Sequence, residues 1–391
     1  MAWVAYVGPF LFPWGQPGSR RVYGIARAIS DAGYKVVVGS GQWGDRQTAR
    51  ADDLSDIEFT SLGDSPPKNG TVASKLKQFF YESGIKTVQW LEQCPTKPSH
   101  VFVYGAGAPF MSRVSRWCRK NRVPLVADVV EWYDGSHMPG GVLGPFSINA
   151  KIAFHYYFNR CDGVVAISSY LKKYFDNSVE NVILIPPTID LSRDGGGEFR
   201  LKHNAPLNLI YAGTPGKKDL LGSVIEAVAR VDESGKKLRL RVLGPNSAQV
   251  SAMLQRTQIP QSVEVLGRVP QNDVSKLLRE ADFSVLLREP LRFAHAGFST
   301  KFVESYAHGV PVIANLTSDI GQYLHDGVEG FVCRDCSVAA LVEVLEKALQ
   351  CSDQNISEMR HNAFQQAVSH FDYRVYVEEM GIFLERLSKR I

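Results

Sequence analysis

Short apolar runs alternate with amphipathic stretches along this chain, and the alternation stops once and then restarts. Apolar runs that are followed by a turn and a stretch of helical periodicity are typical of parallel strands joined by crossover helices. We predict strands at Trp3–Val7, Lys35–Gly39, His100–Tyr104, Leu125–Val129, Gly163–Ile167, Val182–Ile185, Leu207–Ala212, Leu238–Leu243, Val263–Leu266, Phe283–Leu287, Pro311–Ala314 and Gly330–Cys333. We predict helices at Arg20–Ala32, Asp219–Glu233, Ser247–Gln255, Asn272–Glu280, Phe302–His308 and Val338–Leu349. The predicted fold class is α/β, with two Rossmann-like domains.

Glycine and proline mark the place where the alternation stops. Pro186-Pro187 is followed by the glycines of Asp194–Gly197 and then by Asn204–Pro206, which together read as a linker. A chain of 391 residues is also long enough for two domains of similar size. We therefore predict a first domain over residues 1–190, a linker over 191–206, a second domain over 207–370 and a final helix within 371–391.

Composition and charge exclude several classes of protein. Hydrophobic residues make up 45% and charged residues 21% of the chain, which is ordinary for a soluble globular protein. No apolar run is long enough to span a membrane, and Met1–Gly8 fits a first strand better than a signal peptide. The six cysteines show no disulfide framework, and a net charge of +4 is too small to indicate nucleic-acid binding. We expect a cytoplasmic protein without a nucleic-acid partner.

Two local patterns remain open to more than one interpretation. Cys333 and Cys336 have the spacing of a metal or redox pair, but no second Cys or His pair lies at a suitable distance. Basic residues also gather near aromatic ones, namely Arg113, Arg116, Arg119, Lys120 and Arg122 around Trp117, and Lys75, Lys77 and Lys86 around Phe79, Phe80 and Tyr81. Such stretches can attach a protein to an anionic membrane. A solvated helix face above a buried stripe explains them too, and we favour that interpretation.

The strongest functional pattern is the run Gly297-Phe-Ser-Thr-Lys-Phe-Val-Glu-Ser-Tyr-Ala-His-Gly-Val-Pro-Val-Ile-Ala314. Its start reads as a turn that opens a helix, where the backbone N–H groups near Ser299 and Thr300 and the helix dipole suit a pyrophosphate. Lys301 adds a positive charge at the same end. Glu304 shares a helix face with Lys301, and its carboxylate can accept hydrogen bonds from a pair of ribose hydroxyls. The run therefore predicts a nucleotide-diphosphate site.

This run resembles the donor-binding signature of retaining glycosyltransferases with the GT-B fold, in particular family four (group 1). Similar stretches recur at Tyr211–Asp219, Leu266–Pro270, Ala281–Arg288, Ala166–Leu171 and Ile185–Asp190. The resemblance implies two Rossmann-like domains that face each other across a cleft, with a last helix, here Tyr373–Leu387, that crosses back to the first domain. It also implies transfer of a sugar from a nucleotide-sugar donor to an acceptor hydroxyl with retention of anomeric configuration.

The resemblance assigns donor contacts in the second domain residue by residue. Thr214 stands where the family usually has a pyrophosphate-binding arginine, and Lys218, or second to it Lys217, matches the family's lysine. Glu304 matches the ribose-binding glutamate, whereas the glutamate that would touch the sugar is replaced by Ala296. The other candidates are Arg268 and Val269 for the base, Arg288, Arg292, Ala296, Gly297 and Phe298 for the sugar, and His295 for catalysis.

Candidates in the first domain lie after predicted strands. Gly15, Gly18, Ser19 and Arg20 belong to a glycine-rich loop before a helix, where the family binds the donor phosphate and acceptor. The glycines of Gly39–Gly44 match a dinucleotide pattern, but no helix pattern follows them, so we treat this match as chance. Near the acceptor we expect Asp128, Glu131, Asp134 and His137, with Asp128, Glu131 and His137 as catalytic candidates, and Ser168 only as a helix N-cap.

No Asp-x-Asp pair occurs in the sequence, so we expect a transferase without a metal requirement, in which lysines and helix-end amides neutralise the diphosphate. The predicted function is a glycosyltransferase with a saccharide or lipid-linked saccharide acceptor, in surface polysaccharide or glycolipid biosynthesis. The alternatives are a nucleotide-binding partner protein with little activity and a GT-B enzyme of other chemistry, such as a nucleotide-sugar epimerase or a phosphorylase. The base, the sugar and the acceptor are not specified by the sequence.

Overall fold

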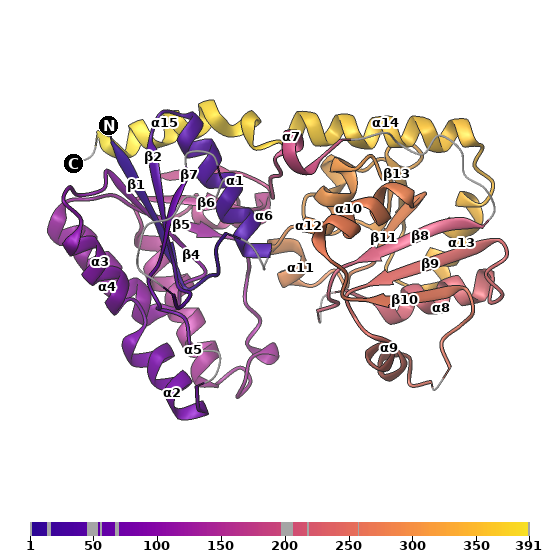
Figure 1. Cartoon of the computed structure of the whole chain (residues 1–391), viewed down its shortest axis with the longest axis horizontal. Helices are drawn as coiled ribbons and strands as arrows, with labels where there is room; N and C mark the ends of the chain where they lie inside the picture. The colour runs from indigo at the N-terminus through magenta and orange to yellow at the C-terminus, as the bar shows by residue number, and fades with distance from the viewer. Residues whose placement is uncertain are drawn as a thin grey trace. The chain divides into compact units, whose positions relative to one another are not determined.

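A computed structural model describes residues 2–13, 17–44, 54, 57–66, 70–196, 206–216, 219–256 and 258–389. The chain divides into two compact units, the first made of Met1–Thr188 and Tyr373–Ile391 and the second of Ile189–Asp372. Each unit is a parallel sheet with helices packed against it (Figure 1). The predicted α/β class with two Rossmann-like domains is therefore confirmed.

In the first unit the described residues form a seven-stranded parallel sheet of order β3-β2-β1-β4-β5-β6-β7. The strands are β1 Trp3–Gly8, β2 Lys35–Ser40, β3 Glu58–Ser61, β4 His100–Tyr104, β5 Leu125–Val129, β6 Gly163–Ala166 and β7 Asn181–Leu184. The strand order reverses between β1 and β4, which pair in parallel with Tyr6 opposite Phe102. Such a switch point is where open α/β sheets bind ligands at their carboxyl ends.

Helices cover this first sheet because each presents an apolar stripe to it. They are α1 Pro17–Asp31, α2 Val72–Lys77, α3 Ile85–Gln93, α4 Ala108–Asn121, α5 Pro145–Ile152, α6 Ser169–Phe175 and α15 Val377–Ser388. On α1 the residues Val22, Ile25 and Ile29 recur at helical spacing and are fully buried.

The last helix, α15, belongs to the first unit, as the resemblance implied. It buries Met380, Phe383 and Leu384 in the core of that unit. A Cβ on Gly163 of β6 would lie 2.6 Å from the ring of Phe383, so the glycine allows the ring to lie directly on the strand.

In the second unit the described residues form a six-stranded parallel sheet of order β10-β9-β8-β11-β12-β13. The strands are β8 Leu207–Ala212, β9 Leu238–Leu243, β10 Val263–Gly267, β11 Phe283–Leu286, β12 Val312–Asn315 and β13 Gly330–Cys333. Its helices are α7 Leu191–Asp194, α8 Leu221–Val231, α9 Ser247–Leu254, α10 Gln271–Glu280, α11 Arg292–Ala296, α12 Thr300–Ala307, α13 Val338–Ala348 and α14 Asp353–His370. Here the strand order reverses between β8 and β11.

Every predicted strand is present, with ends that agree or differ by one residue. The elements without a predicted counterpart are β3 and the helices α2, α3, α4, α5, α7, α11 and α14. Of the stretch expected as a linker, α7 is part of the second unit and Gly196 donates to the carbonyl of Ala307 (3.1 Å), while residues 197–205 lie outside the described part. Cys333 is buried and Cys336 half-buried, and both are free thiols. None of the described helices has both the length and the apolar character needed to cross a membrane.

Candidate functional site

Glycines follow three neighbouring strands at the carboxyl edge of the second sheet. Gly213, Gly244 and Gly267 end β8, β9 and β10 with φ of +135°, +114° and +67°, a region that L side chains rarely adopt. A Cβ on Gly244 would lie 2.5 Å from the carbonyl oxygen of Gly213, so the two turns pack backbone against backbone. The result is an edge without side chains, which a ligand can approach closely. Gly213 and Gly267 belong to segments that resemble the family in sequence, whereas the sequence did not indicate Gly244.

At the switch point of this sheet a buried carboxylate joins two cations. Asp219 accepts hydrogen bonds from Arg288 Nε (2.8 Å), Lys301 Nζ (2.7 Å) and the hydroxyl of Tyr211 (2.7 Å). The side chain of Asp219 is 3% exposed, that of Arg288 11% and that of Lys301 19%. The group brings together the end of β11, the helix α12 and the turn after β8. It carries one negative and two positive charges, so a net positive charge remains for an anionic ligand.

The environment keeps Asp219 ionised. Burial by itself would raise the pKa of its carboxyl, but the charges of Arg288 and Lys301 and the hydrogen bonds from Lys301 and Tyr211 outweigh burial and lower the pKa to about 2. Burial and the Asp219 charge in turn raise the pKa of Tyr211, so its hydroxyl remains a donor. Lys301 was predicted as a charge for the pyrophosphate alone, and the structure shows that Asp219 orients it.

Backbone geometry fixes the two cations. The amide of Asn315 accepts from Arg288 N (2.9 Å) and donates to Arg288 O (2.8 Å), which holds the end of β11 in place. A Cβ on Gly213 would lie 2.4 Å from Cε of Lys301, so only glycine leaves room for the lysine side chain to pass. Arg288 therefore serves first as a partner of Asp219, and its contact with a sugar stays a prediction.

The turn before α12 is anchored by its aromatic residue. The ring of Phe298 packs with its centroid 6.0 Å from that of Phe302, 5.9 Å from Tyr323 and 5.9 Å from Phe371. The Phe298 side chain is therefore core, and a ligand contact at this residue or at buried Gly297 falls to the backbone.

Ser299 and Thr300 open α12 at the end where an anion was predicted. Ser299 takes the N-cap position without capping the helix through its side chain, and its buried hydroxyl has no hydrogen-bond partner among the described residues. Lys301 lies in the first turn and Glu304 in the next, both half-buried and three positions apart, so they share one face of α12. The structure thus brings the predicted pyrophosphate and ribose residues to one helix end.

The sugar and base candidates differ in how well they can reach a ligand. The methyl group of Ala296 is fully buried, so a sugar contact at this residue falls to its backbone and stays a prediction. His295 is half-buried and its Nδ1 accepts from the backbone N–H of Ser318 (3.3 Å), which leaves Nε2 as the ring donor. Arg268, Arg292 and Thr214 are exposed. Val269 packs partly against the core formed by Ile210, Leu243 and Leu278, and Lys217, Lys218 and Gly15 lie outside the described residues.

In the first unit Asp128 is a structural carboxylate. Its side chain is fully buried, it pairs with Arg21 (2.9 Å) and it accepts from the hydroxyl of Tyr6 (2.5 Å). Nε and Nη2 of Arg21 donate to Asp128, and its Nη1 donates to the carbonyls of Ile185 (2.6 Å) and Pro186 (2.7 Å). The prediction that Asp128 meets an acceptor is therefore wrong, because both of its oxygens hold α1 against the strand ends.

The loop after β5 keeps the other acceptor candidates near the surface. Glu131 is half-buried, and His137 is exposed in the turn Gly135–His137. Asp134 accepts from the Ser136 hydroxyl (2.7 Å) and N–H (2.9 Å), and these hydrogen bonds lower its pKa. Their roles toward an acceptor stay predictions.

The first turn of α1 lies against the end of β4. A Cβ on Gly18 would lie 2.8 Å from the hydroxyl of Tyr104, so glycine allows this close approach. Ser19 is buried and donates to the carbonyl of Leu11 (2.7 Å), whereas Arg20 is half-buried. Ser168 accepts from Leu171 N (3.3 Å), which confirms its N-cap role.

Comparison with known families accounts for this arrangement. The family described as "Glycosyl transferases group 1" matches residues 200–368, and "Glycosyltransferase Family 4" matches residues 18–193. The chain belongs to the group 1 glycosyltransferases of the GT-B fold. The first match ends at residue 193 and the second begins at residue 200, close to the boundary between the structural units at Thr188 and Ile189, so each unit holds most of one matched region.

Two distant relatives share part of this chain's sequence. WcaL of Escherichia coli K12, named for colanic acid biosynthesis, is 25% identical over 187 residues, 46% of each chain. AmsK of Erwinia amylovora, an amylovoran biosynthesis glycosyltransferase, is 23% identical and covers 47% of this chain and 46% of its own. The chain therefore spans about half the length of these relatives.

Among solved structures, the sucrose-phosphate synthase of Thermosynechococcus elongatus superposes with a TM-score of 0.77 at 13% identity, with all of both chains covered. HepE of Anabaena, solved in complex with UDP-glucose, superposes with a TM-score of 0.68 at 15% identity over 99% of this chain and 100% of its own. At such low identity these likenesses establish the GT-B fold of this glycosyltransferase.

Proposed function

We propose that this glycosyltransferase moves a sugar from a nucleotide-diphosphate sugar to an acceptor hydroxyl, with retention of anomeric configuration. The observation that carries the proposal is that Lys301 and Glu304 lie on one face of α12, beside the strand-end glycines Gly213, Gly244 and Gly267. A cation next to helix N–H groups suits a diphosphate, and a carboxylate one turn further suits a ribose diol.

The chemical task is to stabilise the leaving nucleotide diphosphate as the glycosidic bond breaks. In the proposed pose the first-turn N–H groups of α12 and the Lys301 ammonium donate to the phosphate oxygens. Asp219 uses one hydrogen of that ammonium, which leaves others for the phosphate. Because this arrangement supplies positive charge from the chain itself, we propose that transfer needs no divalent metal, and addition of EDTA should leave the rate unchanged.

The donor proposal takes its nucleotide from structural likeness. HepE was solved with UDP-glucose, so we propose a uridine diphosphate hexose as the first donor to test. WcaL and AmsK are named for extracellular polysaccharides, so we propose an acceptor saccharide of a surface polysaccharide or glycolipid, carried on a lipid. Such an acceptor would place the enzyme in the cytoplasm at the inner membrane face.

Thermal unfolding with UDP, GDP, ADP and CMP, without metal, tests the nucleotide site. A ligand that binds only the folded state at about 100 times its Kd raises the free energy of unfolding by about 2.7 kcal/mol. We expect one nucleotide to raise the midpoint of the wild type and of Glu346→Ala, a control at an exposed glutamate on α13, but not of Glu304→Ala. No response to any nucleotide would contradict the proposal.

A second candidate function follows from Ala296. Its buried methyl group stands where the family places a sugar-binding glutamate, so a partner protein that binds nucleotide but transfers nothing is the main alternative. Donor turnover separates the two, because a transferase releases free nucleotide diphosphate in the presence of acceptor. Nucleotide binding without release, over a panel of sugars and acceptors, would favour the partner protein.

A further inference from the structure

Exposed apolar side chains gather along one helical segment of the first unit. Helix α5 runs directly into the π-helical turn Ala153–Tyr157, and Ile148, Ile152 and Tyr156 recur every fourth residue with 47%, 45% and 50% of their surfaces exposed. Leu143, just before α5, is 86% exposed. Residues at this spacing share one face of a helix, so they form an apolar stripe that is open to solvent.

A second exposed segment packs against α5. On α2 and the following turn Gln78–Glu82, Val72 is 75%, Leu76 38% and Tyr81 73% exposed. The rings of Phe79 and Phe80 pack against Phe146 of α5, with centroids 4.9 and 5.4 Å apart, which ties the two segments together. In Figure 1 α2 and α5 lie next to each other at the lower end of the first unit. We call these exposed residues of both segments, Val72, Leu76, Tyr81, Leu143, Ile148, Ile152 and Tyr156, the apolar face.

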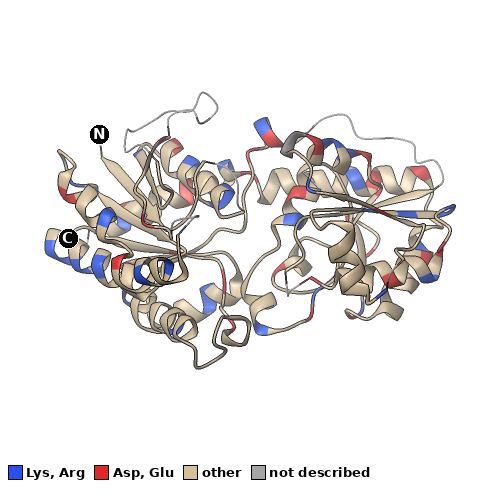
Figure 2. Cartoon of the chain, turned by 60° about the horizontal axis from the view of Figure 1, so that its bottom comes forward, with Lys and Arg blue, Asp and Glu red and all other residues tan. Residues whose placement is uncertain are grey.

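Cations flank the apolar face. Lys75 on α2 and Lys151 on α5 are exposed, and Lys77 of α2 is exposed but pairs with Glu82 (2.7 Å). Figure 2 shows lysine and arginine positions on several helices of the first unit. Chains that lie on an anionic membrane combine apolar and aromatic side chains with basic residues in this way.

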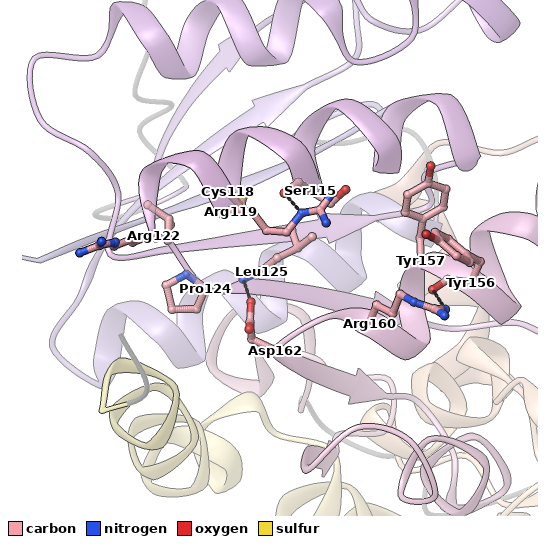
Figure 3. A pocket seen from close by; sticks show the side chains of 11 residues that line it. Ser115, Cys118, Arg119, Arg122, Pro124, Leu125, Tyr156, Tyr157, Arg160 and Asp162 are labelled. Carbon is pink, nitrogen blue, oxygen red and sulfur yellow. Dashed lines mark hydrogen bonds between the residues drawn. The ribbon is translucent and has the colours of Figure 1, made fainter.

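A basic pocket of about 440 Å³ adjoins the apolar face through Tyr156. Arg119, Arg122 and Arg160 are among its lining residues, together with Tyr157 (Figure 3). The guanidinium of Arg160 lies 4.0 Å from the ring centroid of Tyr156 and donates to its carbonyl (3.0 Å), so it is held in place. The carboxylate of the lining, Asp162, is engaged by the backbone N–H of Leu125 (2.8 Å). A pocket of this kind suits a phosphate group.

The structure also corrects which aromatic residues are available. Trp117, around which the basic residues of α4 cluster in the sequence, is 5% exposed, so α4 matches the favoured reading of a solvated basic face above a buried stripe. The exposed aromatic residues of the apolar face are instead Tyr81 and Tyr156.

We propose that the apolar face docks on an anionic lipid bilayer, with its side chains in the interface and the basic pocket on the phosphates of lipid headgroups. The proposal deepens the lipid-carried acceptor of the proposed function, although its physical basis is the surface alone. A bilayer fits this surface because aliphatic, tyrosine and cationic groups lie side by side over two short helical segments.

Vesicle sedimentation tests the proposal, with phosphatidylcholine vesicles and with vesicles in which a third of the lipid is phosphatidylglycerol. We expect the wild type to bind only the anionic vesicles. Ile148→Asp/Ile152→Asp should weaken binding at least about tenfold, whereas Ile382→Asp, at an isoleucine of α15 that is 44% exposed, should not. Arg119→Gln/Arg160→Gln should weaken it by about fivefold for each charge removed and reduce its salt dependence.

Several outcomes would overturn the proposal. They are equal binding to neutral vesicles, no binding to either kind, or full binding by the Ile148→Asp/Ile152→Asp variant. Displacement by millimolar glycerol phosphate would mean that the pocket takes a soluble phosphate, and a wild-type dimer that this variant dissolves would mean that the face pairs two copies. The nucleotide-dependent rise in unfolding midpoint serves as the fold control, and it separates failure of docking from failure of the proposed function.

Discussion

Replacing Asp219 with asparagine removes the one negative charge of the Asp219–Arg288–Lys301 group while keeping the size of the side chain. Arg288 and Lys301 then face each other without a counter-charge, and the new amide N–H₂ points toward groups that donate hydrogen bonds. We expect Asp219→Asn to fold and to be less stable, because the lost interactions lie inside the protein.

The size of the effect follows from the proton affinity of Asp219. Its pKa is about 2 in the folded chain against an ordinary 3.8. At about 1.4 kcal/mol per tenfold change in affinity, the interactions of the charged form add about 2.5 kcal/mol to the free energy of unfolding. Because the folded pKa is depressed, this contribution is complete above pH 4 and is lost only as the pH falls through about 2. For a unit of this size it corresponds to a fall of about 5 to 10 °C in the unfolding midpoint.

Denaturant unfolding at pH 7 measures the loss, with Glu226→Gln as the matched control. Glu226 pairs with Arg230 on the exposed face of α8, where 41% and 58% of the two side chains reach solvent. An exposed pair of this kind contributes at most about 1 kcal/mol. If Asp219→Asn loses no more than Glu226→Gln, the buried carboxylate does not hold the two cations. A double mutant with Lys301→Met adds a check, since coupled residues deviate from additivity by about 0.5 to 3 kcal/mol.

Three further changes test the structure elsewhere. Gly213→Ala should weaken nucleotide-diphosphate binding at least about tenfold, because a Cβ there displaces the side chain of Lys301. The control Gly222→Ala, whose Cβ would have its nearest neighbour at 3.9 Å, should bind like the wild type. Equal affinities of the two variants in calorimetry would contradict this prediction. Burial lowers the pKa of His100 from 6.5 to about 4, so its stabilisation is complete above pH 6.5 and falls by about 3 kcal/mol toward pH 4. His100→Gln, whose amide still donates, should flatten that dependence in denaturant titrations, and an unchanged slope would refute it. Asp128→Asn leaves the buried Arg21 without its counter-charge and should lower the free energy of unfolding by about 3 to 5 kcal/mol in the same assay. A loss under about 1 kcal/mol would mean that water hydrates the arginine.

The elements that the sequence predicted well are those whose pattern is local. β1 and β8 are continuous apolar runs because both faces of a parallel sheet are covered, and α1 and α8 follow with helical spacing. Helix α14 was missed because its buried residues include alanines and Arg360, which is 1% exposed and donates to the carbonyl of Gly309. Its apolar pattern is therefore weak, and its burial depends on partners far along the chain.

The acidic residues show where local reasoning fails. Asp128 was predicted to meet an acceptor although the predicted strand Leu125–Val129 already contained it, and a charge inside a strand that is covered on both faces needs a buried partner. The position of Asp128 inside a predicted strand therefore indicated a buried, paired carboxylate. Asp219 offered no comparable one, because a turn carboxylate next to lysines reads as a surface residue.

The sequence by itself determined two α/β units, the start of a helix at Ser299, and the position of Lys301 and Glu304 on one face of that helix. Each of these features depends on residues a few positions apart. The tertiary structure decided which charges are used. Lys301 meets a carboxylate 82 positions away, and Arg288 meets the same group from 69 positions away. These residues meet because the carboxyl ends of β8 and β11 lie side by side at the switch point of the sheet. Which strands are neighbours depends on the strand order of the whole sheet, and no local sequence pattern encodes that order.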